Sequence, residues 1–266
     1  MPATTPLLQA SAPVAAPGRR WLVATAALAS CLVLFAGNLG PSSTSPATLN
    51  LRAAAGDNLE EHVFASGTWI NPPESVETLL DGSIVATAVA GSDAWSRTSY
   101  GFTRLSASHL VGADLPAGRA IEVAFRGNFV NAFDQAGIFL DVKFPESSAA
   151  AEEVNWAKVG VELSDGVLQV GAVVTRGWSD WSVSPVPTWG SGTITIRVSR
   201  AGDAITVRAR VDAEPFRLVR LAYLDPTAVV SAGPYLASPT KSGLRVNFLS
   251  WKTGPADATL HASLDN

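Results

Sequence analysis

The chain has a single cysteine, Cys31, among its 266 residues, so it cannot form an intrachain disulfide. A reducing compartment fits this, but export is not excluded, because a chain of this length can bury a core that is stable without disulfides. Charged residues make up only 16% of the chain, and the net charge is −4. Since a nucleic-acid partner requires a concentrated basic stripe, we expect no binding to nucleic acid.

Residues that carry common catalytic chemistry are also scarce. The three histidines, His62, His109 and His261, are isolated and lack the H-x-H or H-E-x-x-H spacing of a zinc site. The sequence has neither a nucleophile elbow nor a glycine-rich phosphate loop between a strand and a helix. We therefore expect no metal and no cofactor.

Residues 1–56 contain no Asp or Glu, and Arg19-Arg20 precede an uncharged run over residues 21–37, WLVATAALASCLVLFAG. This run is at the short limit for a membrane span, about 17–25 residues. It slightly exceeds a signal-peptide core of about 7–15 residues. The arginine pair favours a cytosolic N-terminus with the rest translocated. The run predicts a single-pass signal anchor in the membrane. A cleaved signal peptide, which would make the protein secreted, and an organellar transit peptide remain open.

Composition divides the chain further. Residues 1–20 form a leader, residues 21–37 the hydrophobic segment, and residues 38–57 a linker of Gly, Pro, Ser, Thr and Ala that lacks apolar periodicity. The globular domain is expected over residues 58–256, and a C-terminal tail over residues 257–266.

Short β-like runs separated by turn residues such as Asp165-Gly166 fill the globular part. We expect strands at residues 83–89, 121–125, 137–144, 156–163, 168–175, 193–200, 204–211, 216–223, 229–236 and 244–251. Residues 145–153, PESSAAAEE, are either a short helix or a loop insertion. The pattern predicts an all-β protein in which two antiparallel sheets pack as a sandwich.

Two strand pairs differ in the faces that they present. Over residues 193–211 we expect an ordinary buried face, with Ile194, Ile196, Val198, Ile205, Val207 and Ala209 inward, and a solvated face that carries Thr195, Arg197, Thr206, Arg208 and Arg210. Over residues 156–163 Val159, Val161 and Leu163 point one way, and Trp156, Lys158, Gly160 and Glu162 the other.

A tryptophan, a cation and a carboxylate in line are not typical of a solvated face. Trp178, Ser179, Asp180 and Trp181 follow in what we interpret as a polar-aromatic loop. The hairpin from Asn155 to Trp181 is therefore predicted to form one wall of a ligand surface.

Six segments then resemble the DUF1349 family, a group of concanavalin A-like β-sandwich proteins related to the regulation of enolase protein described in yeast. They are TWINPPESVE (68–77), GSDAWSRTSYG (91–101), FDQAGIFL (133–140), NWAKVGVELSDG (155–166), VVTRGWSDWS (173–182) and GPYLASPT (233–240). The resemblance implies a lectin/glucanase-like jelly roll of two bent antiparallel sheets. The chain departs from the family at Ala94, where an aromatic is more common, and in the extra residues 145–153.

The family's polar motif positions fall on Asp93, Trp95, Asp134, Gln135, Trp156, Lys158, Glu162, Ser179, Asp180 and Trp181. With Trp178, these are the candidate ligand-binding residues. The tryptophans would stack on a sugar ring, and the carboxylates, the amide and the lysine would bind its hydroxyls. Packing tryptophans, turn-capping Asp134 and Asp180, and a buried structural charge network remain as alternatives.

These residues favour a non-catalytic carbohydrate-binding module, membrane-anchored or exported. The alternative is an intracellular regulatory or protein-interaction domain related to the regulation of enolase protein, which the absence of any N-x-S/T sequon weakly favours. A lesser alternative is a glycoside hydrolase, which needs two carboxyl groups about 5–5.5 Å or about 6.5–9.5 Å apart. The strand at 156–163 offers only Glu162 and the strand at 137–144 only Asp141.

Overall fold

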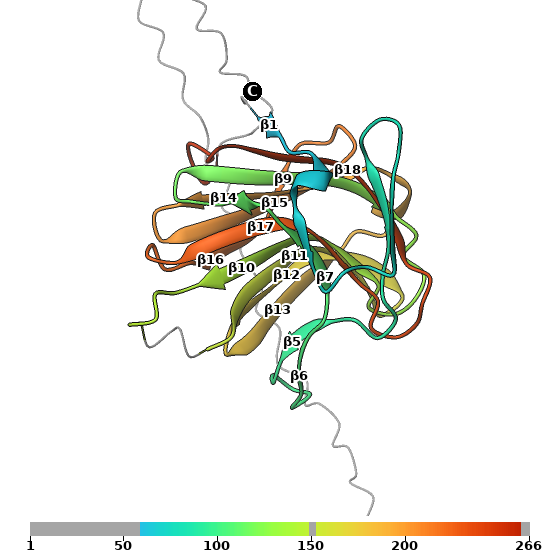
Figure 1. The fold of residues 1–266 in the computed structure, drawn as a ribbon, viewed down its shortest axis with the longest axis horizontal. Coiled ribbons are helices and arrows are strands. Elements are labelled where there is room, and N and C mark those ends of the chain that lie inside the picture. The colour runs from blue at the N-terminus through green and yellow to red at the C-terminus, as the bar shows by residue number, and fades with distance from the viewer. Residues whose placement is uncertain (1–58, 149–152, 262–266) are drawn as a thin grey trace, which may run out of the picture. The chain divides into compact units, whose positions relative to one another are not determined.

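The computed structural model describes residues 59–148 and 153–261, and the regular secondary structure of that part is almost entirely β-strand (Figure 1). The expected leader (1–20), hydrophobic segment (21–37) and linker (38–57) lie outside the described residues, as does part of the 145–153 insertion. Within the described ranges, the chain forms no helix with the length and apolar character that a membrane crossing requires.

The first sheet has the order β16-β15-β14-β9-β18-β4-β3, and β1 pairs with β18. Its strands are β1 (Glu60–Glu61), β3 (Ser75–Thr78), β4 (Ile84–Thr87), β9 (Arg119–Gly127), β14 (Ile194–Ala201), β15 (Ala204–Val211), β16 (Arg217–Tyr223) and β18 (Arg245–Pro255). All of these pairings are antiparallel.

The second sheet has the order β13-β12-β11-β10-β17-β7-β2, and β8 pairs with β17. Its strands are β2 (Thr68–Ile70), β7 (Ser108–Val111), β8 (Ala113–Asp114), β10 (Gln135–Lys143), β11 (Asn155–Ser164), β12 (Val167–Arg176), β13 (Trp178–Pro185) and β17 (Val229–Ala237). Short 3-10 turns, η1 (Phe64–Ser66) and η3 (Trp189–Ser191), lie between strands. A separate hairpin joins β5 (Ala94–Ser96) to β6 (Thr103–Leu105).

The two sheets pack face to face around one apolar core, which confirms the predicted antiparallel sandwich. Val159 and Val161 of β11 point into this core, as do Ile196 of β14 and Val207 of β15. Asp165-Gly166 forms the predicted tight turn between β11 and β12, and both residues have positive φ (52° and 75°). Such a two-residue turn matches the right-handed twist of the strands it joins.

The outer face of β14 and β15 was predicted to be solvated, and this is wrong for its central residues. Arg197 is 1% exposed and Arg208 3% exposed, because residues after β18 cover them. Arg197 pairs with Glu122 at 2.7 Å and with Asp257 at 2.8 Å, and Arg208 also pairs with Asp257. The alternation of the strands is local, whereas the covering segment comes from the far end of the chain.

The segment after β12 was interpreted as a polar-aromatic loop, and this too is wrong. It forms β13, which pairs with β12 from Trp178↔Arg176 to Pro185↔Gln169. Because side chains alternate along a strand, Ser179 and Trp181 lie on one face of the second sheet, and Trp178 and Asp180 on the other. Only residues on the same face of β13 can line one site, so Trp181 cannot share a site with Trp178 or Asp180.

Candidate functional site

A cavity of about 300 Å³ opens on the face of the second sheet that points away from the core. Its apolar walls are Trp95, Tyr100, Phe102, Phe133, Trp181 and Pro239, and its polar lining is Asp93, Arg104, Gln135, Lys158 and Glu162. Of the candidate residues, the fold therefore brings together Asp93, Trp95, Gln135, Lys158, Glu162 and Trp181. They come from β10, β11, β13 and the β5–β6 hairpin, which are far apart in the sequence.

The β5–β6 hairpin forms one wall, and it stands on the open face of the second sheet beside β13 (Figure 1). Trp95 of β5 makes edge contacts with Tyr100, at 5.6 Å between ring centroids, and with Trp181, at 6.3 Å. The Trp95 Nε1 also donates to the Thr98 carbonyl at 2.9 Å. Arg97, within the tip of the hairpin, has a φ of 61°, a conformation that costs a non-glycine residue free energy.

Ser179, a predicted site residue, fastens this hairpin to the sheet. Its Oγ accepts a hydrogen bond from the Ser96 backbone N–H at 2.9 Å and lies 2.9 Å from the Thr175 hydroxyl. Ser96 in turn donates its hydroxyl to the Gly177 carbonyl at 2.6 Å. Since Ser179 is buried by these contacts, its part is to position the wall.

Trp156, also predicted to line the site, lies under the hairpin and not in the cavity. It points to the predicted face but is only 2% exposed. Its ring stacks on Phe139 with centroids 5.6 Å apart, and both belong to a second apolar cluster with Trp95 and Tyr235. The packing alternative holds for this tryptophan, because the hairpin covers the strand at this point.

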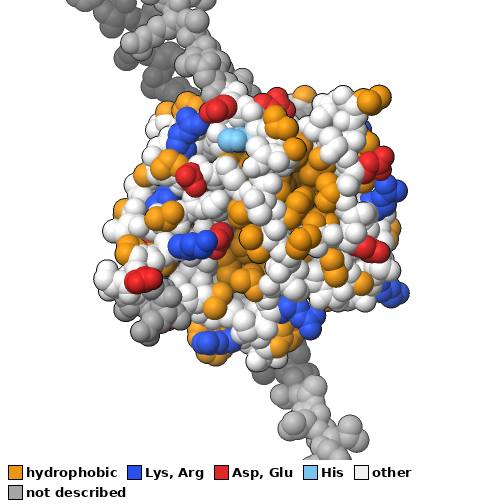
Figure 2. Space-filling view, viewed as in Figure 1, with side chains coloured by type: hydrophobic (Ala, Val, Ile, Leu, Met, Phe, Trp, Pro, Cys, Tyr) orange, Lys and Arg blue, Asp and Glu red, His pale blue; other side chains and the backbone are white. Residues whose placement is uncertain are grey.

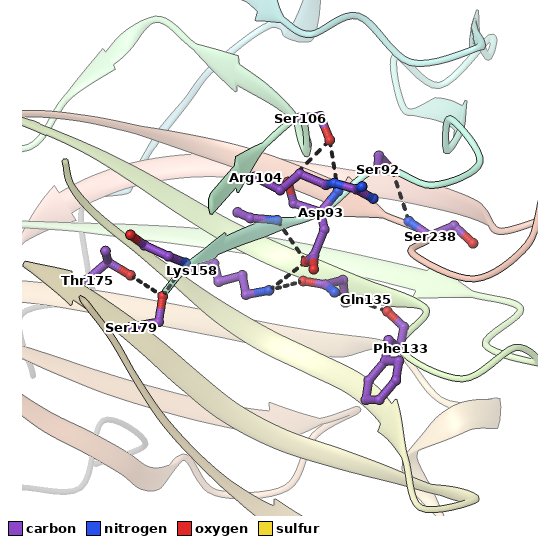
Figure 3. Close-up of polar contacts among 12 residues, drawn as sticks. Ser92, Asp93, Arg104, Ser106, Phe133, Gln135, Lys158, Thr175, Ser179 and Ser238 are labelled. Carbon is purple, nitrogen blue, oxygen red and sulfur yellow. Dashed lines mark hydrogen bonds and ion pairs between the residues drawn. The ribbon is translucent and has the colours of Figure 1, made fainter. Parts of the chain in front are cut away.

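Lys158 forms the centre of the polar floor (Figure 3). Its Nζ lies 3.2 Å from Asp93 Oδ1 and 2.7 Å from Gln135 Oε1. Gln135 donates through Nε2 to the Phe133 carbonyl at 3.1 Å, and Asp93 Oδ1 accepts the Ala94 N–H at 2.7 Å. The lysine charge is thus compensated within the protein, and the floor is a fixed network.

Glu162 differs from the other polar residues of the cavity. Its side chain is partly exposed and lines the cavity, and within residues 59–148 and 153–261 its carboxylate has no hydrogen-bond or ion-pair partner. Burial raises the pKa of Glu162 to about 7; the nearby Lys158 opposes this shift and Asp93 adds to it. A carboxyl group with such a pKa changes charge near neutral pH and can accept or donate a hydrogen bond.

The remaining candidates lie outside the cavity. Asp134 is fully buried and accepts hydrogen bonds from the N–H groups of Val130 (3.1 Å) and Asn131 (2.8 Å) and from the Ser238 hydroxyl (2.6 Å), so it stabilises the turn before β10. Asp180 pairs with Arg220 of β16 at 2.9 Å. Trp178 is 59% exposed.

Five lining residues were not among the candidates: Tyr100, Phe102, Arg104, Phe133 and Pro239. Tyr100, Phe133 and Pro239 lie inside the family-like segments, but no periodicity marks them as lining a cavity. Only the tertiary arrangement of the hairpin and of the residues next to β10 and β17 does so. Among the described residues, no group of three or more His, Cys, Asp or Glu side chains is arranged to hold a metal ion.

Hydrophobic side chains gather in patches between scattered charges on the face of the molecule in Figure 2, and no basic stripe crosses it.

A structure from Saccharomyces cerevisiae, described as a functionally unknown protein, is similar to this chain with a TM-score of 0.64 and 28% identity, over 74% of this chain and all of that one. The GH43 protein BlXynB from Bacillus licheniformis has a TM-score of 0.50 at 12% identity, over 74% of this chain and 38% of that one. This second likeness concerns the fold alone.

Two sequence comparisons agree with the family suggested by the motifs. "Regulation of enolase protein 1" of Saccharomyces cerevisiae is 31% identical over 199 residues, which span 74% of this chain and 94% of that protein. The family model described as "Protein of unknown function (DUF1349)" matches residues 69–256. The chain belongs to the DUF1349 family.

Proposed function

We propose that the chain is a non-catalytic binding module that holds a carbohydrate in the cavity between the β5–β6 hairpin and the second sheet. The observation that carries this proposal is the pairing of exposed aromatic walls with a preorganised polar floor in one concave site. Sites for small ligands are typically apolar clefts with a few convergent polar groups.

The two halves of the cavity match the two faces of a sugar ring. The ring's C–H face can lie against Trp181 or Tyr100, which are partly and largely exposed, respectively. Its hydroxyls can donate hydrogen bonds to the Glu162 carboxylate. A volume of about 300 Å³ is at the lower end of ligand sites and admits roughly one or two sugar rings.

The carboxyl groups of the cavity argue for binding over hydrolysis. Glycoside hydrolysis uses one carboxyl group as acid and a second as nucleophile or base. Asp93 is engaged by Lys158 and by the Ala94 N–H, which leaves Glu162 as the available group of the lining. Release of reducing sugar by the wild type that disappears in Glu162→Gln would instead establish the hydrolase.

The test is a titration of the full chain with a panel of oligosaccharides, using two tryptophan variants. Trp181→Ala removes a cavity wall and should weaken binding by about tenfold or more, since truncating a tryptophan that anchors a binding site typically costs roughly 2 kcal/mol or more. Trp178→Ala, on the opposite face of the same strand, should leave the affinity unchanged. The proposal fails if the panel gives no binding, or if both variants bind as the wild type does.

We further propose that residues 21–37 anchor or export the domain, as their apolar character and the preceding arginine pair suggest. Carbonate extraction followed by protease protection of a C-terminally tagged chain tests this. A tag that is protected, with the protein in the membrane fraction, supports a translocated domain. A protected tag on a soluble protein indicates export with cleavage, whereas a digested tag, on a soluble or a membrane-bound protein, contradicts the proposal.

A second candidate function is a regulatory domain that binds a protein. The name of the yeast relative, which concerns the regulation of enolase, favours it. Tyr100 and Phe102 at the hairpin tip are exposed and would be suitable contacts. Co-purification of enolase with the wild type that is lost in Tyr100→Ala, with no binding of oligosaccharide, would favour this candidate over the carbohydrate module.

A further inference from the structure

Glu162 is the one carboxyl group of the cavity lining that forms no ion pair within the described part of the protein. Lys158, two residues before it on β11, is already bound to Asp93 and Gln135. Tyr235 of β17 is buried near Glu162, and the pKa of its phenol is raised well above its ordinary value, mainly by burial, so the tyrosine stays neutral. Neither Lys158 nor Tyr235 therefore forms an ion pair with the Glu162 carboxylate.

Arg104 of β6 is the other cation of the lining, and it is held at the rim. Its guanidinium donates to the Gly91 carbonyl at 2.8 Å and lies over the Phe102 ring at 5.8 Å from the centroid. Within the described ranges it forms no ion pair with Glu162 or Asp93. The charges that face Glu162 from the surrounding elements are therefore a neutralised lysine–aspartate pair and one arginine engaged elsewhere.

Aromatic rings line the same cavity as this carboxyl group. Trp181 shares with Glu162 both the main cavity and a small adjoining space of about 10 Å³. Trp95 and Tyr100 also line the main cavity, and Trp95 is in edge contact with both Tyr100 and Trp181. Ring faces carry negative electrostatic potential and attract cations, most strongly for tryptophan and where water is excluded.

We infer that the ligand group that enters this cavity is positively charged, as is the protonated amine of an amino sugar, and that it pairs with Glu162 against the ring of Trp181. This inference rests on the proposed carbohydrate function and specifies the class of sugar. An ammonium group would supply the opposite charge that the carboxylate lacks, and it would gain from the aromatic walls at the same time.

Neutral and acidic sugars fit the same geometry less well. A hydroxyl can bind to Glu162 in either protonation state, but it leaves the cost of burying the carboxylate uncompensated. A uronate would bring a further negative charge beside Glu162 and Asp93, where like charges disfavour ionisation. The raised pKa of Glu162 agrees, since burial is its main cause and the opposing effect of Lys158 is smaller.

The test compares three forms of one oligomer: oligoglucosamine, its N-acetylated form, and its N-trimethylated form, whose charge does not titrate. Calorimetric titration of the full chain at pH 6.5 should give an affinity for oligoglucosamine about tenfold or more above that for the N-acetylated form. Affinity for the N-trimethylated form should rise as the pH increases from 5 to 8, because Glu162 ionises over this range.

Glu162→Gln should abolish both the preference for the amine and the rise with pH, whereas Trp178→Ala should retain both. Equal affinities for charged and N-acetylated oligomers would overturn the inference but leave the carbohydrate function standing. A preference that persists in Glu162→Gln would also overturn it. Binding of tetramethylammonium, but of no oligosaccharide, would keep the cation site and refute the carbohydrate function. Binding of neither refutes both.

Discussion

Replacing Glu162 by glutamine should stabilise the folded protein at alkaline pH and have little effect at acidic pH. A carboxyl group whose pKa is higher in the folded than in the unfolded state favours folding only while it is protonated. For Glu162 the folded value is about 7 and the ordinary value is 4.5. The contribution of Glu162 to the stability of the folded state is fully present below pH 4.5 and is lost as the pH rises towards 7. Glutamine keeps the shape and does not ionise.

The size of the effect follows from the difference between the two pKa values, which is about 2.5. At roughly 1.4 kcal/mol per pKa unit this corresponds to about 3 kcal/mol at most. Glu162 is partly exposed to the cavity, so solvent screening reduces the value. We expect the free energy of unfolding of Glu162→Gln to exceed that of the wild type at pH 8 by on the order of 1–3 kcal/mol.

Urea denaturation of the wild type and the variant at pH 5 and pH 8 measures this difference. The contributions of the other titrating groups to the free energy of unfolding are the same in both proteins and cancel in the comparison. Glu77→Gln, on the exposed strand β3, is the matched control and should show no such pH-dependent gain. A Glu162→Gln variant that is less stable than the wild type at pH 8, or a difference that is the same at both pH values, would refute the described environment of Glu162.

Three further changes test the structure around the site. Lys158→Met should lower the free energy of unfolding by about 2–4 kcal/mol, since it leaves Asp93 without its cation, and Asp93→Asn in the same chain should recover part of the loss in a double-mutant cycle. Gly160→Ala should lower the free energy of unfolding by more than about 2 kcal/mol, because its Cβ would lie 2.1 Å from a backbone oxygen of β10. Gly190→Ala is the control. Its Cβ meets nothing closer than 3.9 Å, so the same denaturation assay should give a loss under about 0.5 kcal/mol. Asp257→Asn should cost about 2–4 kcal/mol, since it removes the carboxylate that two buried arginines share, and an unchanged denaturation midpoint would show that the residues after β18 do not cover this face in solution.

The sandwich and the odd face of β11 could be predicted from the sequence because both depend on local alternation. Val159 and Val161 recur with a period of two, and Lys158 and Glu162 necessarily face the other way. The turn at Asp165-Gly166 fixes the register with β12, and this register follows from its two residues. These are short-range constraints.

β13 was missed because its composition resembles a loop. Trp178, Ser179, Asp180 and Trp181 include two residues that favour turns, and the strand lies at a sheet edge where one side needs no partner strand. Once β13 is a strand, its parity separates Trp181, in the cavity, from Trp178 and Asp180, which lie outside it. Because the segment was taken as a loop, no parity was available to exclude Trp178 and Asp180, which the fold keeps out of the site.

The covering of both faces could not be predicted because it depends on contacts between distant segments. The β5–β6 hairpin buries Trp156 and supplies Tyr100 and Phe102 to the cavity wall. Asp257 likewise reaches Arg197 across 60 residues of sequence. Neither contact has a local signal, since alternation shows which way a side chain points but not what covers it.

The central claim, that the cavity under the β5–β6 hairpin is the ligand site, is tested most directly by a crystal structure of the protein with the tightest-binding oligosaccharide of the panel. We expect one sugar ring against Trp181, with a donor group within hydrogen-bond distance of the Glu162 carboxylate and the Lys158–Asp93 pair unchanged. A ligand bound elsewhere, for example over the exposed Trp178, with the cavity left empty, would contradict the claim.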